Sequence, residues 1–214
     1  AFNDCDLVPK VLANVGKPNL STTVFGRKIS MPIFLSPTAM QRLYHPEGDN
    51  ASARAAEKFD TFYSMSTMAN TTIEEIANVS SGPKIFQLYI HKDKSITDDL
   101  IDRCKRANFD GLCLTVDTIV AGNRERDHRS GFTTPPKLGL KSIISFASKP
   151  KWVFDYLANK KFELSNVKNK TEKGTNIAKS VIQYINEQYD PGMNWNDAEY
   201  VICLLYTSDA ADDL

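Results

Sequence analysis

In Lys84-Ile85-Phe86-Gln87-Leu88-Tyr89-Ile90, a short apolar run carries a glutamine and a tyrosine near its end. Residues 95–107 follow with apolar side chains at helical spacing, and 112–117 form a second apolar run. Short apolar runs bounded by polar residues are typical of buried strands, whereas one apolar stripe is typical of a surface helix. Strand, helix and strand in this order predict two parallel strands joined by a right-handed crossover.

The same alternation extends toward the N-terminus. Apolar runs over 31–35 and 61–66 predict two further strands, and alanine-rich 47–58 predicts a helix between them. A threonine pair precedes Ile73 and can cap a helix that begins there, with acidic residues in its first turn. Strand and helix therefore recur at a spacing of roughly 25 residues, as in α/β folds.

Two closures of such a sheet are compatible with this alternation, an open doubly wound sheet and a (β/α)₈ barrel. Polar residues at the strand ends favour the barrel, since barrel strands converge on one mouth that holds the active site. No strand is followed by a GxGxxG or a P-loop motif, which argues against a dinucleotide or P-loop site. We therefore predict an α/β fold, the N-terminal half of a TIM barrel with about four of its eight units. The polar strand-end residues are Ser36, Thr38, Ser66, Gln87, Tyr89, Thr115 and Asp117.

Composition excludes several classes of protein. The chain has 214 residues, 42% of them hydrophobic and 24% charged, with a formal net charge of zero. Such a balance is globular and gives no sign of a nucleic-acid partner. The four cysteines lack CxxC spacing, so we predict no metal site and a reducing, cytoplasmic environment.

The alternation breaks after the fourth strand. Residues 122–139 are predicted to form a loop, and 137–179 contain ten lysines and three acidic residues around an aromatic segment, 152–157. Two interpretations remain open: a mobile solvated loop, or a surface that contacts anionic lipid at the inner face of the cell membrane.

The predicted organisation is an N-terminal segment with a hairpin turning at Gly26 (1–30), barrel units one to four (31–136), a basic excursion (137–190), the start of the next helix (191–200) and a non-native tail (201–214).

The residue types at the strand ends indicate a chemistry. Serine, threonine and glutamine are neutral groups that suit hydrogen bonds to the edge of a planar heterocycle. Arg124 follows the fourth strand, and its guanidinium fork matches the two oxygens of a carboxylate. A ring cofactor and an acidic substrate are the resulting hypothesis.

Four motifs give this hypothesis a family. Four short motifs resemble those of the FMN-dependent α-hydroxy-acid dehydrogenase/oxidase family, and they occur along the chain in the family's order and close to its spacing. They are 36–40 (SPTAM), 45–48 (HPEG), 86–89 (FQLY) and 114–118 (LTVDT). Further segments are most similar to the bacterial respiratory L-lactate dehydrogenases; they span 149–152, 162–166 and 190–195.

The resemblance implies FMN as cofactor and assigns residues to it. The backbone of Pro37, Thr38 and Ala39 is expected to face the reactive edge of the flavin. The side chains expected to hydrogen-bond the flavin ring are Ser66, Gln87 and Thr115.

The resemblance also implies a small 2-hydroxy acid as substrate. Tyr89 is expected to contact the substrate hydroxyl, and Met68 the substrate side chain. Arg124 is expected to bind the substrate carboxylate or to stabilise the transition state. The family's catalytic histidine is expected in a second half that this chain lacks. Surface or structural roles are therefore predicted for His45, His91 and His128.

The implied activity is oxidation of L-lactate to pyruvate with a respiratory quinone or cytochrome as acceptor. The intact protein is expected to be a homo-oligomer, and this truncated chain is expected to be inactive alone. Two alternatives stay open: an oxidase of glycolate or another 2-hydroxy acid, and a non-catalytic half-barrel that binds flavin or an anion.

Overall fold

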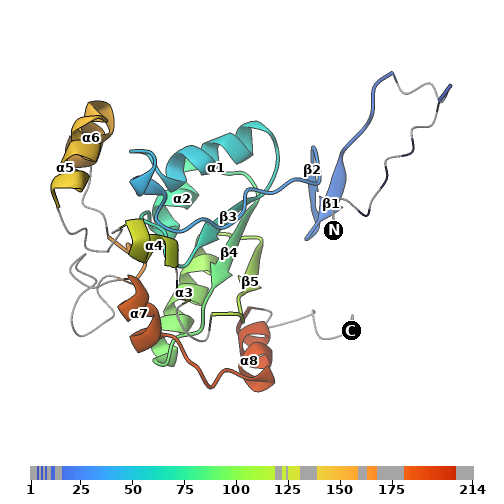
Figure 1. The fold of residues 1–214 in the computed structure, drawn as a ribbon. Helices are drawn as coiled ribbons and strands as arrows, with labels where there is room; N and C mark the ends of the chain where they lie inside the picture. Colours follow the sequence, from blue (N-terminus) through green and yellow to red (C-terminus); the bar gives the residue numbers. More distant parts are fainter. Residues whose placement is uncertain are drawn as a thin grey trace.

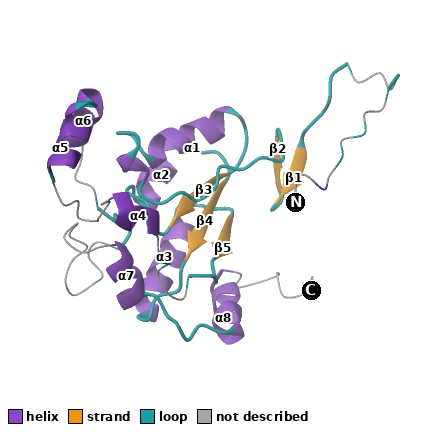
Figure 2. Ribbon diagram, viewed as in Figure 1, coloured by secondary structure: helices purple, strands orange, loops and turns teal. Residues whose placement is uncertain are grey.

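The computed structural model describes residues 4, 6, 8, 11–12, 16–118, 122–123, 125–130, 139–158, 163–167 and 181–205. Its centre is a parallel sheet in the order β3 (Tyr63–Ser66), β4 (Lys84–Leu88) and β5 (Gly111–Leu114) (Figures 1 and 2). The apolar runs predicted over 61–66, 84–90 and 112–117 therefore form parallel strands, as expected.

The predicted first strand, 31–35, is present only as one parallel bridge between Leu35 and Tyr63. The Leu35 amide donates to the Phe62 carbonyl at 3.0 Å, and the Ser64 amide donates back to Leu35 at 3.0 Å. Pro32 has no amide hydrogen to contribute to a ladder, which is one reason why the pairing does not extend toward the N-terminus. Even so, four parallel segments lie side by side in chain order.

The three crossover helices form one layer. They are α1 (Asp49–Lys58), α2 (Ile73–Val79) and α3 (Lys94–Arg106). Helix α1 packs against α2, and α2 packs against α3, so all three cover the same face of the sheet. Strands in chain order with helices on one face match part of a barrel, since a doubly wound sheet carries helices on both faces. The described residues do not form a closed barrel.

Local sequence explains where these helices begin. Thr72 caps α2 by accepting the amide of Glu75 at 3.1 Å, and the Glu75 carboxylate accepts the Thr72 amide at 3.1 Å. This reciprocal capping box satisfies two amides that the first turn leaves free. Asp93 caps α3, because its carboxylate accepts the Ser95 amide at 3.0 Å. On α1, the buried small residues Ala53 and Ala56 pack in the main core.

A hairpin of β1 (Thr22–Val24) and β2 (Arg27–Ile29) turns at Gly26, as predicted. Gly26 has φ +69°, a left-handed conformation that glycine adopts without strain. Ile29 packs with Phe62 and Ile85 in a small apolar cluster beside the amino ends of β3 and β4. The hairpin thus lies at the end of the sheet opposite the polar strand ends.

Helices occupy much of the segment after β5. Helix α4 (Glu125–Ser130) lies within the predicted loop 122–139, so this part of the loop prediction is wrong. The described part of the excursion contains α5 (Leu140–Ala147), α6 (Pro150–Ala158) and α7 (Val181–Gln188). Figure 1 shows α5 and α6 standing out from the body of the molecule, while α7 lies close to α3. No helix in the described ranges is long and apolar enough to cross a membrane.

The last helix, α8 (Trp195–Leu205), continues past residue 200. It packs against α3, where Tyr200 donates a hydrogen bond to Asp98 at 3.0 Å. Val201 is 3% exposed and belongs to the main core. The first residues of the predicted non-native tail are therefore part of a packed helix, and 206–214 lie outside the described residues.

Candidate active site at the carboxyl ends of the strands

Ser66, Gln87 and Thr115 meet where the three strands end. The register pairs Ser66 with Gln87, and Thr115 follows the last residue of β5. The Gln87 amide nitrogen donates to Thr115 Oγ1 at 2.7 Å, and its oxygen accepts the Ser66 hydroxyl at 3.4 Å. Ser66 and Gln87 are 3% and 5% exposed, so their polar atoms depend on these partners. We call this group the strand-end network.

Thr67 belongs to the same network, although the sequence analysis did not single it out. Its hydroxyl donates to the Gln87 carbonyl at 2.6 Å and accepts the Tyr89 amide at 3.2 Å. Its own amide donates to the Gln87 carbonyl at 3.1 Å. Thr67 therefore holds the end of β4 beside the end of β3. The one available signal was a second polar residue after Met65, which is weak because strand-end hydroxyls are common.

The predicted substrate residues Tyr89 and Met68 flank this network. Tyr89 follows β4 by one residue and is half-buried, and its phenol oxygen lies 3.5 Å from the hydroxyl of Thr118. Met68 is 5% exposed, and its amide donates to Ser66 Oγ at 3.2 Å. The structure thus brings Tyr89 and Met68 to the same end of the sheet as the strand-end network.

Pro37, Thr38 and Ala39 lie in the loop after Leu35, at the same end of the sheet. Pro37 and Thr38 are exposed, while Ala39 packs against the main core. The loop is joined to the loop after β3, because the Met40 amide donates to the Met68 carbonyl at 3.2 Å. Main-chain groups of 37–39 therefore border the strand ends.

The predicted carboxylate ligand Arg124 lies outside the described residues. His45 is exposed, whereas His91 is fully buried, with Nε2 3.0 Å from the Tyr184 hydroxyl. Burial lowers the pKa of His91 to about 4, so it is neutral at neutral pH. The side chain of His128 is not among those described.

A buried carboxyl supports the loop that carries Met68. Asp49, at the start of α1, accepts the Tyr63 hydroxyl at 2.9 Å and the Asn70 amide at 3.3 Å. Burial raises the pKa of Asp49, and the hydrogen bond from Tyr63 opposes that shift. Burial, together with the neighbouring Asp49, raises the pKa of Tyr63 well above its ordinary value. This pair ties helix α1 to β3 and to the loop that follows it.

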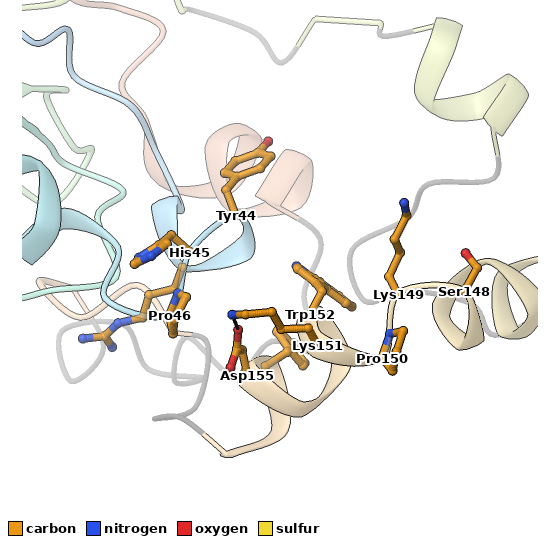
Figure 3. A pocket seen from close by; sticks show the side chains of 11 residues that line it. Tyr44, His45, Pro46, Ser148, Lys149, Pro150, Lys151, Trp152 and Asp155 are labelled. Carbon is orange, nitrogen blue, oxygen red and sulfur yellow. Dashed lines mark hydrogen bonds and ion pairs between the residues drawn. The ribbon is translucent and has the colours of Figure 1, made fainter.

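A cavity of about 430 Å³ lies elsewhere, between residues 42–46 and the α5–α6 junction (Figure 3). The Trp152 indole donates to the Leu43 carbonyl at 2.8 Å, which joins α6 to that segment. Lys151 lies 2.8 Å from Asp155 on the same helix, so part of its charge is balanced. None of the predicted site residues lines this cavity.

The described residues contain no group of three or more His, Cys, Asp or Glu side chains suited to a metal ion.

The strand-end network is chemically neutral. It offers hydroxyls, an amide and main-chain groups, with a phenol beside them. Such a set can hydrogen-bond the edge of a planar heterocycle without the desolvation penalty of burying a charge. The fold is that of part of a barrel-type α/β protein, and the strand-end network at the carboxyl ends of the strands is its candidate site.

Comparison with known proteins identifies the family within this class. The family model described as FMN-dependent dehydrogenase matches residues 1–203, and the chain belongs to this family. FMN is the family's cofactor. Glycolate oxidase 1 of Zea mays is 34% identical over 201 residues, covering 94% of this chain and 48% of the relative. Glycolate oxidase of Spinacia oleracea is 43% identical over 143 residues, covering 67% and 39%.

Solved structures agree with the fold. The crystal structure of the monotopic membrane protein (S)-mandelate dehydrogenase matches with a TM-score of 0.83 at 28% identity, covering 92% of this chain and 52% of that one. The chain therefore spans about half the length of the relatives that it matches. The resemblance noted in the sequence is confirmed at the level of the family, and FMN as cofactor is confirmed with it.

Proposed function

We propose that this protein oxidises a small L-2-hydroxy acid, L-lactate, to the 2-oxo acid, pyruvate in this case. The strand-end network beside Tyr89 is the observation that carries the proposal. Its neutral hydrogen-bonding groups are suited to the edge of a ring, and they lie next to a phenol that can meet a substrate hydroxyl. In the family the oxidant is FMN, which when bound accepts the hydrogen and electron pair removed from the substrate.

The residues present fit the flavin. Ser66, Gln87 and Thr115 offer donors and acceptors at one edge of the sheet, and they already exchange hydrogen bonds with one another. Groups held in place by such mutual bonds lose little freedom when a ligand arrives. The backbone of 37–39 offers further main-chain groups on the other side of this edge. We assign Ser66, Gln87, Thr115, Pro37, Thr38 and Ala39 to the cofactor.

Tyr89, Arg124 and Met68 are assigned to the substrate. The Tyr89 phenol is proposed to hydrogen-bond the substrate hydroxyl and to stabilise charge that develops there. Arg124 is proposed to pair with the carboxylate through its guanidinium fork. Met68 is proposed to border the substrate side chain, because it is buried next to Ser66. We assign no catalytic base among the described residues, and His91 is not proposed for that role because it is fully buried and joined to Tyr184.

Residues 149–152, 162–166 and 190–195 are similar to respiratory L-lactate dehydrogenases, and this similarity favours L-lactate as the substrate. The same similarity implies a quinone or cytochrome as the electron acceptor. The relatives compared above carry the names glycolate oxidase and (S)-mandelate dehydrogenase, so these acids are the rival substrates. Steady-state turnover with L-lactate, glycolate and (S)-mandelate, each with oxygen and with a soluble quinone, tests the choice. A preference for L-lactate and quinone is expected; a preference for oxygen would assign an oxidase.

Tyr89→Phe tests the role of the site separately from substrate choice. Loss of the phenol hydroxyl is expected to lower kcat/KM by about 10- to 100-fold, as for removal of one hydrogen bond to developing charge. FMN binding is expected to stay intact. If Tyr89→Phe turns over L-lactate as fast as the wild type, the assignment of Tyr89 is wrong.

A second proposal concerns membrane contact through the basic excursion. Four apolar side chains on α5 and α6 are more than half exposed: Ile143 (51%), Ile144 (69%), Phe154 (71%) and Leu157 (75%). Lys149 and Lys151 lie on the same helical hairpin. Exposed apolar residues beside lysines suit the interface of an anionic lipid surface. One relative is itself described as a monotopic membrane protein.

Sedimentation with anionic liposomes tests this contact. Phe154→Ser and Ile144→Ser are expected to reduce the bound fraction, while Leu20→Ser, at a 57% exposed apolar residue of the N-terminal segment, serves as the control. Binding is expected to weaken as salt rises. Equal binding of all three variants would overturn the proposal.

Two further expectations belong to the same proposal. The intact protein is proposed to be a homo-oligomer, which light scattering of the product of the complete gene can test. The rival function is a flavin- or anion-binding half-barrel without catalysis. The rival predicts that the 214-residue chain retains FMN without turnover, and detectable lactate oxidation by this chain would refute the rival.

A further inference from the structure

Tyr189 lies one hundred residues after Tyr89 in the chain, yet the two rings are stacked. Their centroids are 4.6 Å apart, and the ring planes differ by 24°. Tyr189 is 3% exposed, whereas Tyr89 is half-buried at the end of β4. Offset stacking of this kind stabilises a ring pair beyond the area that it buries. The ring of the proposed substrate-contacting tyrosine thus rests on a buried aromatic from the far end of the excursion.

The backbone on both sides of Tyr189 is tied to the segment after Tyr89. The Lys92 amide donates to the Gln188 carbonyl at 2.8 Å, and the Asp190 amide donates to the Ile90 carbonyl at 3.1 Å. Between these bonds, Tyr189 and His91 form an antiparallel bridge. Residues 188–190 therefore behave as a short extra strand against 90–92.

Two lysines add charged anchors. The Lys92 ammonium donates to the carbonyls of Asn186 and Glu187, at 3.0 and 2.9 Å, at the end of α7 where carbonyls lack helical partners. The Lys94 ammonium lies 3.3 Å from Asp190. The same ammonium is 2.6 Å from Asp197 in α8. These contacts hold the chain on both sides of Tyr189, without touching its ring.

The ring of Tyr189 is also supported from behind. The His91 ring meets it edge to face at 5.4 Å and 90°, and the Tyr184 ring does so at 5.9 Å and 85°. His91 and Tyr184 are joined at 3.0 Å. The buried Tyr189 hydroxyl has no hydrogen-bond partner within the described residues. The ring, rather than its hydroxyl, is therefore what the surroundings hold.

We propose that Tyr189 is a positioning residue that sets the orientation of the Tyr89 ring at the strand ends. Within the described part of the chain, the Tyr89 hydroxyl has one hydrogen bond, the long 3.5 Å contact with Thr118, so the stack is the closer constraint on the ring. This inference rests on the proposed function, in which the Tyr89 phenol meets the substrate hydroxyl. Through the stack of Tyr189 on Tyr89, the end of the excursion determines the orientation of the Tyr89 phenol.

Three variants of the full-length protein, expressed from its complete gene, test the proposal. Tyr189→Phe keeps the ring and removes the unpaired hydroxyl. Tyr189→Leu removes the stack. Phe109→Leu is the matched control, because it removes an aromatic that packs on the main core and whose ring contact is with Phe86 rather than with Tyr89 or Tyr189. If Tyr189→Leu does not fold, Tyr189→Met replaces it.

Two readouts are combined: anaerobic flavin reduction by L-lactate, and binding of 2-hydroxy-2-methylpropanoate by calorimetry. That analogue keeps the hydroxyl and carboxylate but has no α-hydrogen to give up. Tyr189→Leu is expected to slow reduction by about 10-fold or more, as misplacement of a reacting group does. Tyr189→Phe is expected to stay within about twofold of the wild type, since an unpaired buried hydroxyl contributes no contact. Phe109→Leu is expected to lose thermal stability while its reduction rate remains near that of Tyr189→Phe.

A crystal structure of Tyr189→Leu adds a readout that needs no turnover, and it is expected to show the Tyr89 ring displaced from its position in the wild type. An unmoved Tyr89 ring would overturn the inference, as would equal slowing in Phe109→Leu or in Tyr189→Phe. If the wild type is neither reduced by any 2-hydroxy acid nor able to bind the analogue, the proposed function fails instead. The position of the Tyr89 ring then still decides whether Tyr189 orients it.

Discussion

Replacing Gln87 with leucine removes the side chain at the centre of the strand-end network. Gln87 is 5% exposed, so water cannot readily replace what is lost. The 2.7 Å bond to Thr115 disappears, and the Ser66 hydroxyl loses its acceptor. The Thr67 amide keeps a partner, because it also donates to the carbonyl of residue 87 at 3.1 Å. We expect the free energy of unfolding to fall by about 1–3 kcal/mol, the cost of leaving buried polar groups unpaired.

The same substitution tests the assignment to FMN. One lost hydrogen bond of about 0.5–1.5 kcal/mol raises the Kd for FMN by about 2- to 12-fold. Urea denaturation measures the first effect and quenching of flavin fluorescence on binding measures the second, both on the full-length protein.

Lys84→Met provides the matched control. Lys84 is 4% exposed at the opposite end of β4, where its ammonium donates to the carbonyls of Ser80 and Gly82 at 3.1 and 2.7 Å. This variant is expected to lose stability without a change in the Kd for FMN. Equal weakening of FMN binding in both variants would mean that the effect reflects loosening of the sheet, and the assignment of Gln87 would be refuted.

Three further predictions concern the framework. Thr72→Ala removes half of the capping box with Glu75 and is expected to lower the free energy of unfolding by about 1 kcal/mol in urea denaturation; no change would mean that the cap is dispensable. Hydrogen bonds from Arg103 lower the pKa of Glu74 below its ordinary value of 4.5, so their contribution is present above about pH 4.5 and is lost as the pH falls through the lowered pKa. Because the Glu74 side chain is 53% exposed, Glu74→Gln is expected to cost less than about 1 kcal/mol at pH 7. The cost is expected to shrink as the pH falls through the lowered pKa of Glu74, and a cost that does not change with pH would contradict this expectation. Ile101→Ala removes a fully buried side chain of α3 and is expected to cost about 2–5 kcal/mol in the same denaturation assay, a loss below 1 kcal/mol being inconsistent with a packed core.

Local signals in the sequence predicted most of the framework. The threonine pair before Ile73 marked the start of α2, and Gly26 marked the hairpin turn. Apolar runs of the right length became β3, β4 and β5, with the polar strand ends at one edge. The first predicted strand shrank to the bridge at Leu35, because apolar composition alone does not report how many main-chain bonds a partner supplies.

The candidate site was predictable only in part. Ser66, Gln87 and Thr115 could be located because the end of a strand is visible in the sequence. The stack of Tyr189 on Tyr89 was not, since it joins residues one hundred positions apart and depends on how α7 docks beside β4. The helices α5 and α6 were missed for a related reason: their lysine-rich surroundings obscured two short amphipathic segments.

The most direct test of the central claim is anaerobic mixing of L-lactate with the full-length protein loaded with FMN. The account predicts that the visible absorbance of the flavin is lost and that one pyruvate appears for each flavin reduced. A flavin that stays oxidised with L-lactate, glycolate and (S)-mandelate alike would contradict it.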